Sequence, residues 1–202
     1  MPFNPSNVKV AAGTLYAAPI GTTEPTSVSG TWPTGWEQIG YTEQGSEFDF
    51  GPTVTPINVE EEYYPVRQAI TSYTGKLTFV MDELTQQNLA LAMNAGIGSS
   101  LVASSQPTPP AGQFYQEPVN PGFEVRVMLG WGAEFEGQAD EIPDAFQRFI
   151  WRQCLQVGSV KRVFRKGAAI ANYAVEFALE KPGGVQAGLQ PWRSIQPASL
   201  VS

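Results

Sequence analysis

Histidine is absent from this 202-residue chain, and cysteine occurs once, as Cys154. Without imidazole the chain cannot build a Ser-His-Asp or Cys-His catalytic arrangement, nor a catalytic zinc site that uses histidine ligands. A single cysteine cannot form an internal disulfide bond, so nothing requires an oxidising compartment. Because Cys154 lies within an apolar strand pattern, we interpret it as a small core residue rather than a nucleophile. The commonest routes to catalysis are therefore missing.

Long hydrophobic runs are missing as well. The opening stretch MPFNPSNVKV has no apolar segment of the kind that signal peptides contain, and no run of about 18 apolar residues occurs. The chain is therefore expected to be soluble, with neither a signal peptide nor a membrane-spanning helix. No GxxxxGK[ST] motif is present, and GWGAEF lacks the third glycine of a dinucleotide-binding fingerprint. We accordingly expect no cofactor.

Charged residues are scarce, at 15% of the chain, and the 19 acidic residues exceed the 12 basic ones for a formal net charge of -7. Four of the cations nevertheless fall within six positions, as Lys161, Arg162, Arg165 and Lys166. Such a cluster can neutralise phosphates, but an acidic molecule repels a polyanion at long range. Carboxylates of another protein chain are therefore the more plausible local partner for these cations.

Three segments alternate apolar and polar residues with a period of two, which is typical of antiparallel strands with one buried and one solvated face. The apolar positions are Tyr73, Leu77, Phe79 and Met81, then Phe123, Val125, Val127, Leu129 and Trp131, then Ala171, Tyr173, Val175, Phe177 and Leu179. Shorter strands are predicted at 14–19, 36–41, 45–50 and 149–157. The last of these has mixed periodicity, so a helix there is the alternative.

One helix is predicted within DELTQQNLALAMNAG, with Asp82 as the N-cap, Glu83 in the first turn and Gly96 as the C-terminal stop. Its apolar stripe is expected to pack on the sheet. Long loops are predicted at about 20–35, 57–73 and 98–122. The whole chain, 1–202, is expected to be one domain with a short C-terminal extension.

Two acidic clusters lack a catalytic pattern. Glu60, Glu61 and Glu62 would alternate between faces of an extended segment, so they cannot present three carboxylates to one substrate. The stretch EFEGQADEIPD, residues 134–144, could hold a calcium ion, but its spacing does not match an EF-hand loop. We interpret the first cluster as a solvated or partner-facing loop and the second as an acidic loop.

Three stretches carry a resemblance to a known family. They are GTLYAAPIGTTEPTSVSGTWPTGWEQIGYTEQGSEFDFGPTVTPINVEE, YYPVRQAITSYTGKLTFVMDELTQQNLALAMN and FRKGAAIANYAVEFALEKPGG. In this order they resemble the major tail proteins, the tail tube subunits, of long-tailed bacteriophages that infect actinobacteria. The similarity covers most of the chain and is weakest over 97–120 and 133–147. It implies a mainly β fold, an antiparallel β-sandwich or partial barrel with one flanking α-helix.

The resemblance also implies a function. Tail tube proteins form hexameric rings whose sheets join into a barrel, and the rings stack into the tube that conducts DNA during ejection. Ring closure removes free strand edges, and heterologous stacking produces an open polymer. The chain would then be a structural virion protein and not an enzyme, assembled in the host cytoplasm with tape-measure and tail tip proteins. The alternatives are a tube subunit of a related contractile injection or secretion system, or a nucleic-acid-binding module.

Two sets of residues are predicted to serve assembly. Carboxylates that alternate with core residues are expected to face the lumen, because a negative wall lets DNA slide without sticking. They are Glu47, Asp49, Glu124, Glu176 and Glu180, with Lys76 and Arg126 as minority cations on the same wall. Residues 57–73 are expected to form an extended arm that reaches a neighbouring subunit. The predicted subunit-interface residues are Lys161, Arg162, Arg165, Lys166, Glu60, Glu61, Glu62, Tyr63 and Tyr64.

Overall fold

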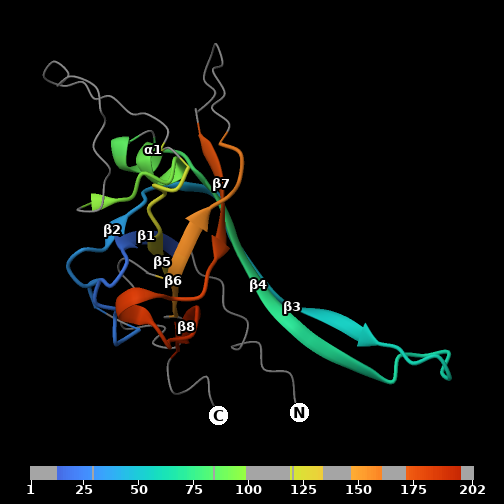
Figure 1. Ribbon diagram of the computed structural model, residues 1–202. Coiled ribbons are helices and arrows are strands. Elements are labelled where there is room, and N and C mark those ends of the chain that lie inside the picture. Colours follow the sequence, from blue (N-terminus) through green and yellow to red (C-terminus); the bar gives the residue numbers. More distant parts are fainter. Residues whose placement is uncertain are drawn as a thin grey trace, which may run out of the picture.

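The computed structural model describes residues 13–28, 30–83, 85–98, 119, 121–133, 147–160 and 172–196. Within these ranges the chain forms one antiparallel sheet and one α-helix (Figure 1). The strand order is β2-β1-β5-β6-β7-β4-β3, with β8 paired to β6 off this path, so the sheet is not closed. The predicted mainly β fold with a flanking helix is confirmed.

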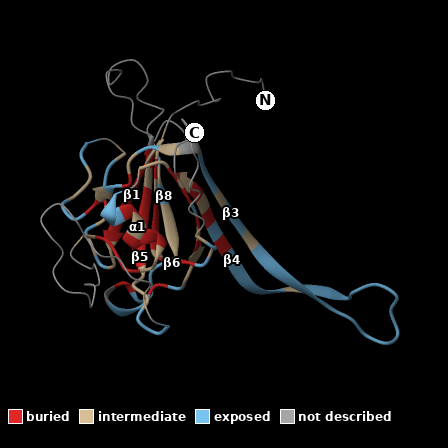
Figure 2. Ribbon diagram, turned by 90° about the horizontal axis from the view of Figure 1, so that it is seen from above, coloured by how far each residue is buried: buried red, intermediate tan, exposed pale blue. Residues whose placement is uncertain are grey.

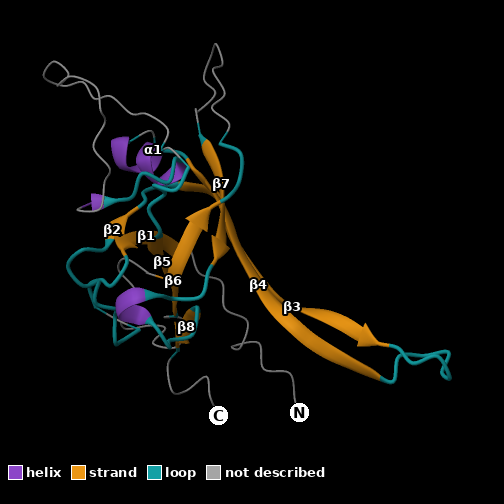
Figure 3. Ribbon diagram, viewed as in Figure 1, coloured by secondary structure: helices purple, strands orange, loops and turns teal. Residues whose placement is uncertain are grey.

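Figure 3 distinguishes the helices, strands and loops of these elements. The elements are β1 (Gly13–Pro19), β2 (Glu37–Gln38), β3 (Thr42–Ile57), β4 (Arg67–Met81), α1 (Gln86–Ala92), β5 (Val127–Ala133), β6 (Arg148–Gln156), β7 (Tyr173–Leu179), a 3₁₀ turn (Gly184–Gln186) and β8 (Trp192–Ile195). Strand β6 has two partners on one side: β8 pairs with Arg148–Trp151, and β7 pairs with Cys154–Gln156. The sheet therefore branches at β6.

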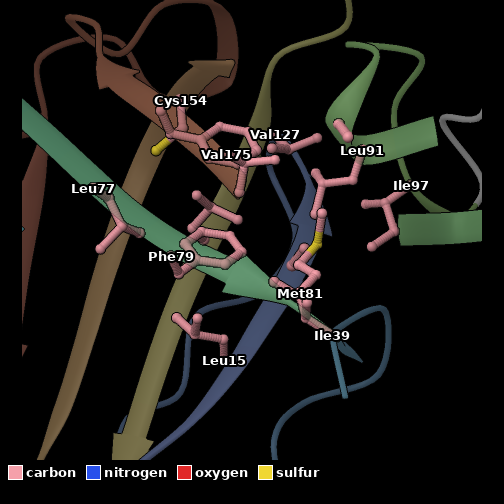
Figure 4. Packing of buried hydrophobic residues seen from close by; sticks show 14 of the residues in the cluster. Leu15, Ile39, Leu77, Phe79, Met81, Leu91, Ile97, Val127, Cys154 and Val175 are labelled. Carbon is pink, nitrogen blue, oxygen red and sulfur yellow. The ribbon is translucent and has the colours of Figure 1, made fainter. Parts of the chain in front are cut away.

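The main core lies on one face of the sheet, where the odd-numbered residues of β4 and β7 meet. Alternation buries Leu77, Phe79 and Met81 of β4, and Phe79 stacks on Phe177 of β7 with the ring centroids 5.7 Å apart. Leu91 of α1 closes this core at one end (Figure 4). The period-two prediction is thus confirmed for these strands, because one side of each strand packs against the helix and the facing strands.

The opposite face of β1, β5 and β6 is also buried, contrary to the solvated face expected for the alternating segment that contains β5. A second core cluster contains Tyr16, Met128 and Ile150, and the loop after β1 covers it. Trp32 of this loop stacks on Tyr16 at 4.3 Å between ring centroids. Gly130 makes room for the indole, since a Cβ at that position would lie 2.6 Å from the Trp32 ring.

An ion-pair cluster fixes the same loop to the sheet. Arg152 of β6 binds Glu24 with both ends of its guanidinium group, Nε to Oε1 at 2.6 Å and Nη2 to Oε2 at 3.1 Å. Arg193 of β8 approaches the same carboxylate, with Nε 3.1 Å from Oε2. Only 7% of the Arg152 side chain and 15% of the Glu24 side chain is exposed. This part of the predicted 20–35 loop is therefore held against the protein by buried charges.

Several predicted boundaries differ from the structure. The segment 149–157 is strand β6 rather than a helix, and 14–19 is confirmed as β1. The strand expected at 36–41 is reduced to Glu37–Gln38. The strand that was expected to include Phe123 begins at Val127, and the Phe123 side chain is 71% exposed. Residues 121–126 precede the pairing of β5 with β1, so none of the described strands pairs beside Phe123.

Helix α1 begins later than its sequence predicts. Its N-cap is Thr85, whose hydroxyl oxygen accepts a hydrogen bond from the Asn88 backbone N–H at 3.1 Å, and not Asp82. Asp82 instead donates its backbone N–H to the carbonyl of Tyr41 at 3.0 Å. Glu83, expected in the first turn, accepts a hydrogen bond from the Tyr41 N–H. Both residues therefore continue the contact with the start of β3 before the helix begins.

The β3–β4 hairpin leaves the body of the protein. β4 pairs with β7 over Lys76–Met81, and beyond that point β3 is its only partner among the described strands. We call residues 50–75 the arm and residues 58–66 its tip; the arm extends clear of the sheet (Figure 1). From Phe50 to Ile57 it spans roughly 24 Å at about 3.4 Å per residue. The loop predicted at 57–73 is too long, because β4 already begins at Arg67.

Candidate functional site

The arm exposes apolar side chains along its whole length. Tyr63, Tyr64 and Val66 at the tip have relative exposures of 103%, 83% and 62%, and Ile57 and Ile70 are exposed on the strands. Figure 2 shows the contrast with the body, where β1, β5 and β6 are mostly buried. Exposed apolar surface of this extent is typical of a protein interface. The arm is therefore a candidate surface for contact with another chain.

Both strands of the arm also leave main-chain groups without a strand partner on their outer sides. β3 is the last strand of the sheet, and from Arg67 to Gly75 the other side of β4 has no paired strand among the described residues. Free edges of this length can accept a strand of another molecule. Edge pairing and apolar contact can thus act together in the same segment.

A groove lies where the arm joins the body. Phe50, Tyr73, Leu179 and Trp192 form its apolar walls, and it has a volume of about 560 Å³. The Phe50 ring stacks on Tyr73 at 5.6 Å and meets the Trp192 ring edge-on at 5.7 Å. The sequence pattern did not predict this site. Its walls come from β3, β4, β7 and β8, and their meeting depends on the sheet order.

Three of the predicted lumen carboxylates, Glu47, Asp49 and Glu176, share one face of β3, β4 and β7. Glu47 lies opposite Thr78, which in turn lies opposite Glu176, and Asp49 lies opposite Lys76. Directly paired residues of antiparallel strands point to the same side of the sheet, here the side away from Leu77. On β5, the loop that contains Trp32 covers the sheet. Among the described residues, no comparable loop with large apolar side chains covers this face. The face is thus polar and accessible.

Two cations partly neutralise this polar face. Lys76 Nζ lies 2.6 Å from Glu176 Oε1, and this hydrogen bond together with the charge of Glu176 raises the pKa of Lys76. Arg126 Nε lies 3.1 Å from Glu180 Oε2. Burial alone would raise the pKa of Glu180, but hydrogen bonds from Gln153 and Arg126 and the charge of Arg126 outweigh it, so the pKa lies below its usual value.

Glu124 lies outside the strands, in the turn before β5. Its Oε2 accepts a hydrogen bond from the Gly122 N–H at 3.0 Å and lies 3.9 Å from Arg126 Nη1. The backbone hydrogen bond from Gly122 is the main reason that the pKa of Glu124 is lowered. Glu124 and Glu180 thus share the cation Arg126, whereas Lys76 is paired with Glu176.

The other predicted residues divide into three groups. Glu60, Glu61 and Glu62 are exposed at the tip of the arm beside the two tyrosines. Lys161, Arg162, Arg165 and Lys166, like the acidic loop 134–144, lie outside the described residues. Cys154 is fully buried, as expected of a core residue, and burial raises the pKa of its thiol well above the usual range. Its thiol is therefore protonated and inaccessible at neutral pH.

None of the helices in the described ranges is long and apolar enough to cross a membrane. No curated protein matches the chain. The family model for "Phage tail tube protein" matches residues 1–122, which include β1 to β4, the whole arm and α1. That match covers more than half of the sequence, and the chain therefore belongs to the phage tail tube protein family and is a structural component of the virion tail.

Proposed function

We propose that the chain polymerises as stacked hexameric rings into the tube that conducts DNA during ejection, in a phage of actinobacteria. The single observation that carries this proposal is the arm, with free strand edges and exposed apolar residues. A monomer gains nothing from such a segment, whereas a ring can pair its edges and cover its apolar side chains. The tube is assembled in the host cytoplasm with tape-measure and tail tip proteins.

Negative-stain imaging of the purified full chain over rising concentration tests this proposal. We expect rings and hollow tubes with sixfold rotational averages, because a heterologous contact repeated around an axis closes into a ring. A protein that stays monomeric at millimolar concentration, or that forms only closed dimers, would contradict the proposal.

The polar face of β3, β4 and β7 is proposed to line the lumen. Replacing Glu47 and Asp49 together by Lys should leave assembly intact, because both side chains are exposed and neither is in contact with an ion-pair partner among the described residues, although the charge of Asp49 acts on Lys76. The variant tubes should retain short DNA that wild-type tubes release, and each phosphate neutralised should add about 0.7 to 0.9 to the slope of log affinity against log salt. Co-sedimentation of DNA with tubes measures both effects.

The matched control is the neutral pair Glu47→Gln and Asp49→Asn, which removes the carboxylates without adding cations. It should retain much less DNA than the lysine variant. A map of the tube with Glu47, Asp49, Glu124, Glu176 and Glu180 on the outer surface or within the wall would contradict the lumen assignment.

The cations Lys161, Arg162, Arg165 and Lys166 are proposed to bind acidic residues of an adjacent subunit. Replacing Arg162 and Arg165 together by Glu should leave the monomer folded and raise the concentration needed for tubes. Exposed ion pairs contribute only about 0 to 1 kcal/mol each, but the contact repeats throughout the tube. Light scattering during assembly measures the shift.

Reversing Glu61 and Glu62 to Lys in the same chain should partly restore assembly. Unchanged assembly of the Arg162→Glu and Arg165→Glu variant would show that the cations are solvated. Tight, salt-sensitive DNA binding by the wild type that the variant loses would instead identify them as a DNA contact.

A further inference from the structure

The groove at the base of the arm has aromatic walls that are partly exposed. Phe50 and Tyr73 remain 40% and 61% exposed although they stack on each other. Gly75 between them is buried, and a Cβ there would lie 3.1 Å from Leu179 and 3.2 Å from Phe50, so the missing side chain keeps the groove open. A volume of about 560 Å³ is within the range of sites that bind a compact apolar group.

The tip of the arm carries groups of matching chemistry. Tyr63 and Tyr64 have almost no contact with the rest of their own chain. Tyrosines are common anchors in interfaces, because the ring buries a large apolar area while the hydroxyl stays hydrated at the rim. Aromatic walls in turn offer stacked and edge-on contacts of the kind that Phe50 already makes with Trp192.

The tip cannot reach the groove of its own chain. β3 and β4 stay paired from Phe50 and Gly75 at the base to Ile57 and Arg67 next to the tip. The paired strands hold the two ends of the arm roughly 24 Å apart, at about 3.4 Å per residue. Any tip that occupies this groove must therefore come from another copy, and tip-to-base contact is heterologous, as in rings and open polymers.

Charges favour the same pairing. The tip presents Glu60, Glu61 and Glu62, whereas the rim of the groove carries Lys181, which is exposed and has no ion pair among the described residues. Glu180, the carboxylate of the groove lining, is already paired with Arg126. The positive charge of Lys181 at the rim can therefore attract an acidic segment.

We propose that the groove formed by Phe50, Tyr73, Leu179 and Trp192 receives Tyr63 and Tyr64 from the arm tip of another copy, with Lys181 beside the tip carboxylates. This inference rests on the proposed assembly of the chain into tubes and names the contact that holds neighbouring subunits. In this contact Glu60, Glu61 and Glu62 lie beside Lys181 instead of the cations at 161–166. The Lys181→Glu variant distinguishes these two partners.

Directed crosslinking tests the contact in the full chain. One preparation carries Glu62→Cys at the tip, which keeps both tyrosines, and a second carries Gln190→Cys at the rim of the groove. The native Cys154 is fully buried and should not react. A short bismaleimide added to the mixed, assembled proteins should join tip to groove and give a covalent dimer of the two chains. The matched control replaces the rim cysteine by Val157→Cys, which is exposed directly after the last residue of β6 and does not line the groove.

Two further variants connect the contact to assembly. Tyr63→Ala with Tyr64→Ala should raise the concentration needed for assembly by about tenfold or more, since central aromatic anchors dominate interface affinity. The melting temperature of the monomer should stay unchanged because neither side chain is buried. Lys181→Glu should lower the crosslink yield, and an unchanged yield would remove Lys181 from the contact.

The outcomes separate this inference from the proposed function. Tubes that form normally but give no more Glu62–Gln190 crosslink than the Val157 control would overturn the groove contact and leave tube assembly standing. Crosslinked dimers without rings or tubes would support the groove contact and contradict the tube. Neither crosslinks nor tubes would overturn both.

Discussion

Replacing Glu24 by Ala is expected to lower the free energy of unfolding by roughly 3 to 5 kcal/mol. The substitution leaves the guanidinium group of Arg152 buried at 7% exposure with no carboxylate to balance its charge. Arg193 loses the same partner, although it keeps a hydrogen bond from Nη2 to the carbonyl of Pro25 at 2.6 Å. Urea unfolding followed by tryptophan fluorescence measures the loss.

The control for this prediction is Glu62→Ala, which removes one carboxylate from the exposed tip and should change stability by less than about 0.5 kcal/mol. Combining Glu24→Ala with Arg152→Met should recover part of the loss, because the second substitution removes the unbalanced charge. A loss below about 1 kcal/mol in the single variant would show that water reaches Arg152 and that the cluster does not hold the loop.

Shortening the arm is expected to abolish tube formation while the monomer stays folded. Gly51 lies opposite Thr74, so an Asn-Gly turn can join these two residues in place of residues 52–73. The deleted residues pair only with each other and are mostly exposed, so the core keeps its contacts. We expect no tubes at concentrations about a hundredfold above the wild-type threshold, as measured by sedimentation velocity and electron microscopy.

A full-length arm with Thr55→Val and Thr71→Val serves as the control. These substitutions remove a weak contact between two exposed hydroxyls, 3.5 Å apart, and an exposed hydrogen bond from the Thr71 hydroxyl to the Thr53 carbonyl at 3.2 Å. They keep the shape and β-propensity of both strands. This variant should still assemble. Tubes formed by the shortened chain would show that the arm is dispensable and that other surfaces hold the subunits together.

Alternation in the sequence predicted the strands whose neighbours lie on both sides. β7 and the inner half of β4 follow the predicted parity, with Phe177 and Phe79 stacked in the core. The alternation of apolar and polar residues does not show where a strand extends past the end of the strand that flanks it. Tyr73 has the parity of the core residues in β4, yet it lies past the last residue that pairs with β7 and is 61% exposed.

The strand predicted at 45–50 is shorter than β3, which extends from Thr42 to Ile57 and continues through two prolines. Pro52 and Pro56 lie within β3, opposite Tyr73 and Gln68. An edge strand tolerates proline, because an amide that faces away from the partner strand has no hydrogen bond to lose. The position of a strand in the sequence does not show whether it lies at the edge of the sheet. The strand order is also needed to recognise that residues 67–73 form part of β4.

The candidate site could be predicted only in its local part. The parity of Glu47, Asp49 and Glu176 placed them on one polar face, as the strand register has them. The groove brings together Phe50 and Trp192, which are distant in sequence and meet through the sheet order and the branch at β6. Such contacts depend on tertiary structure and leave no periodic signal.

The pairing of β1 with β5 has a consequence for synthesis on the ribosome. Pro19 pairs with Val127, so β1 emerges long before its central partner, and at about 5 to 20 residues per second the wait is roughly 5 to 20 s. The β3–β4 hairpin, in contrast, needs only contacts that are close in sequence and can form as soon as Met81 has emerged. The segment with the most exposed apolar surface is thus complete while the body is still unfinished. Newly made chains on neighbouring ribosomes can therefore meet through their arms before either has a folded core. Slower translation gives these arms more time to associate prematurely.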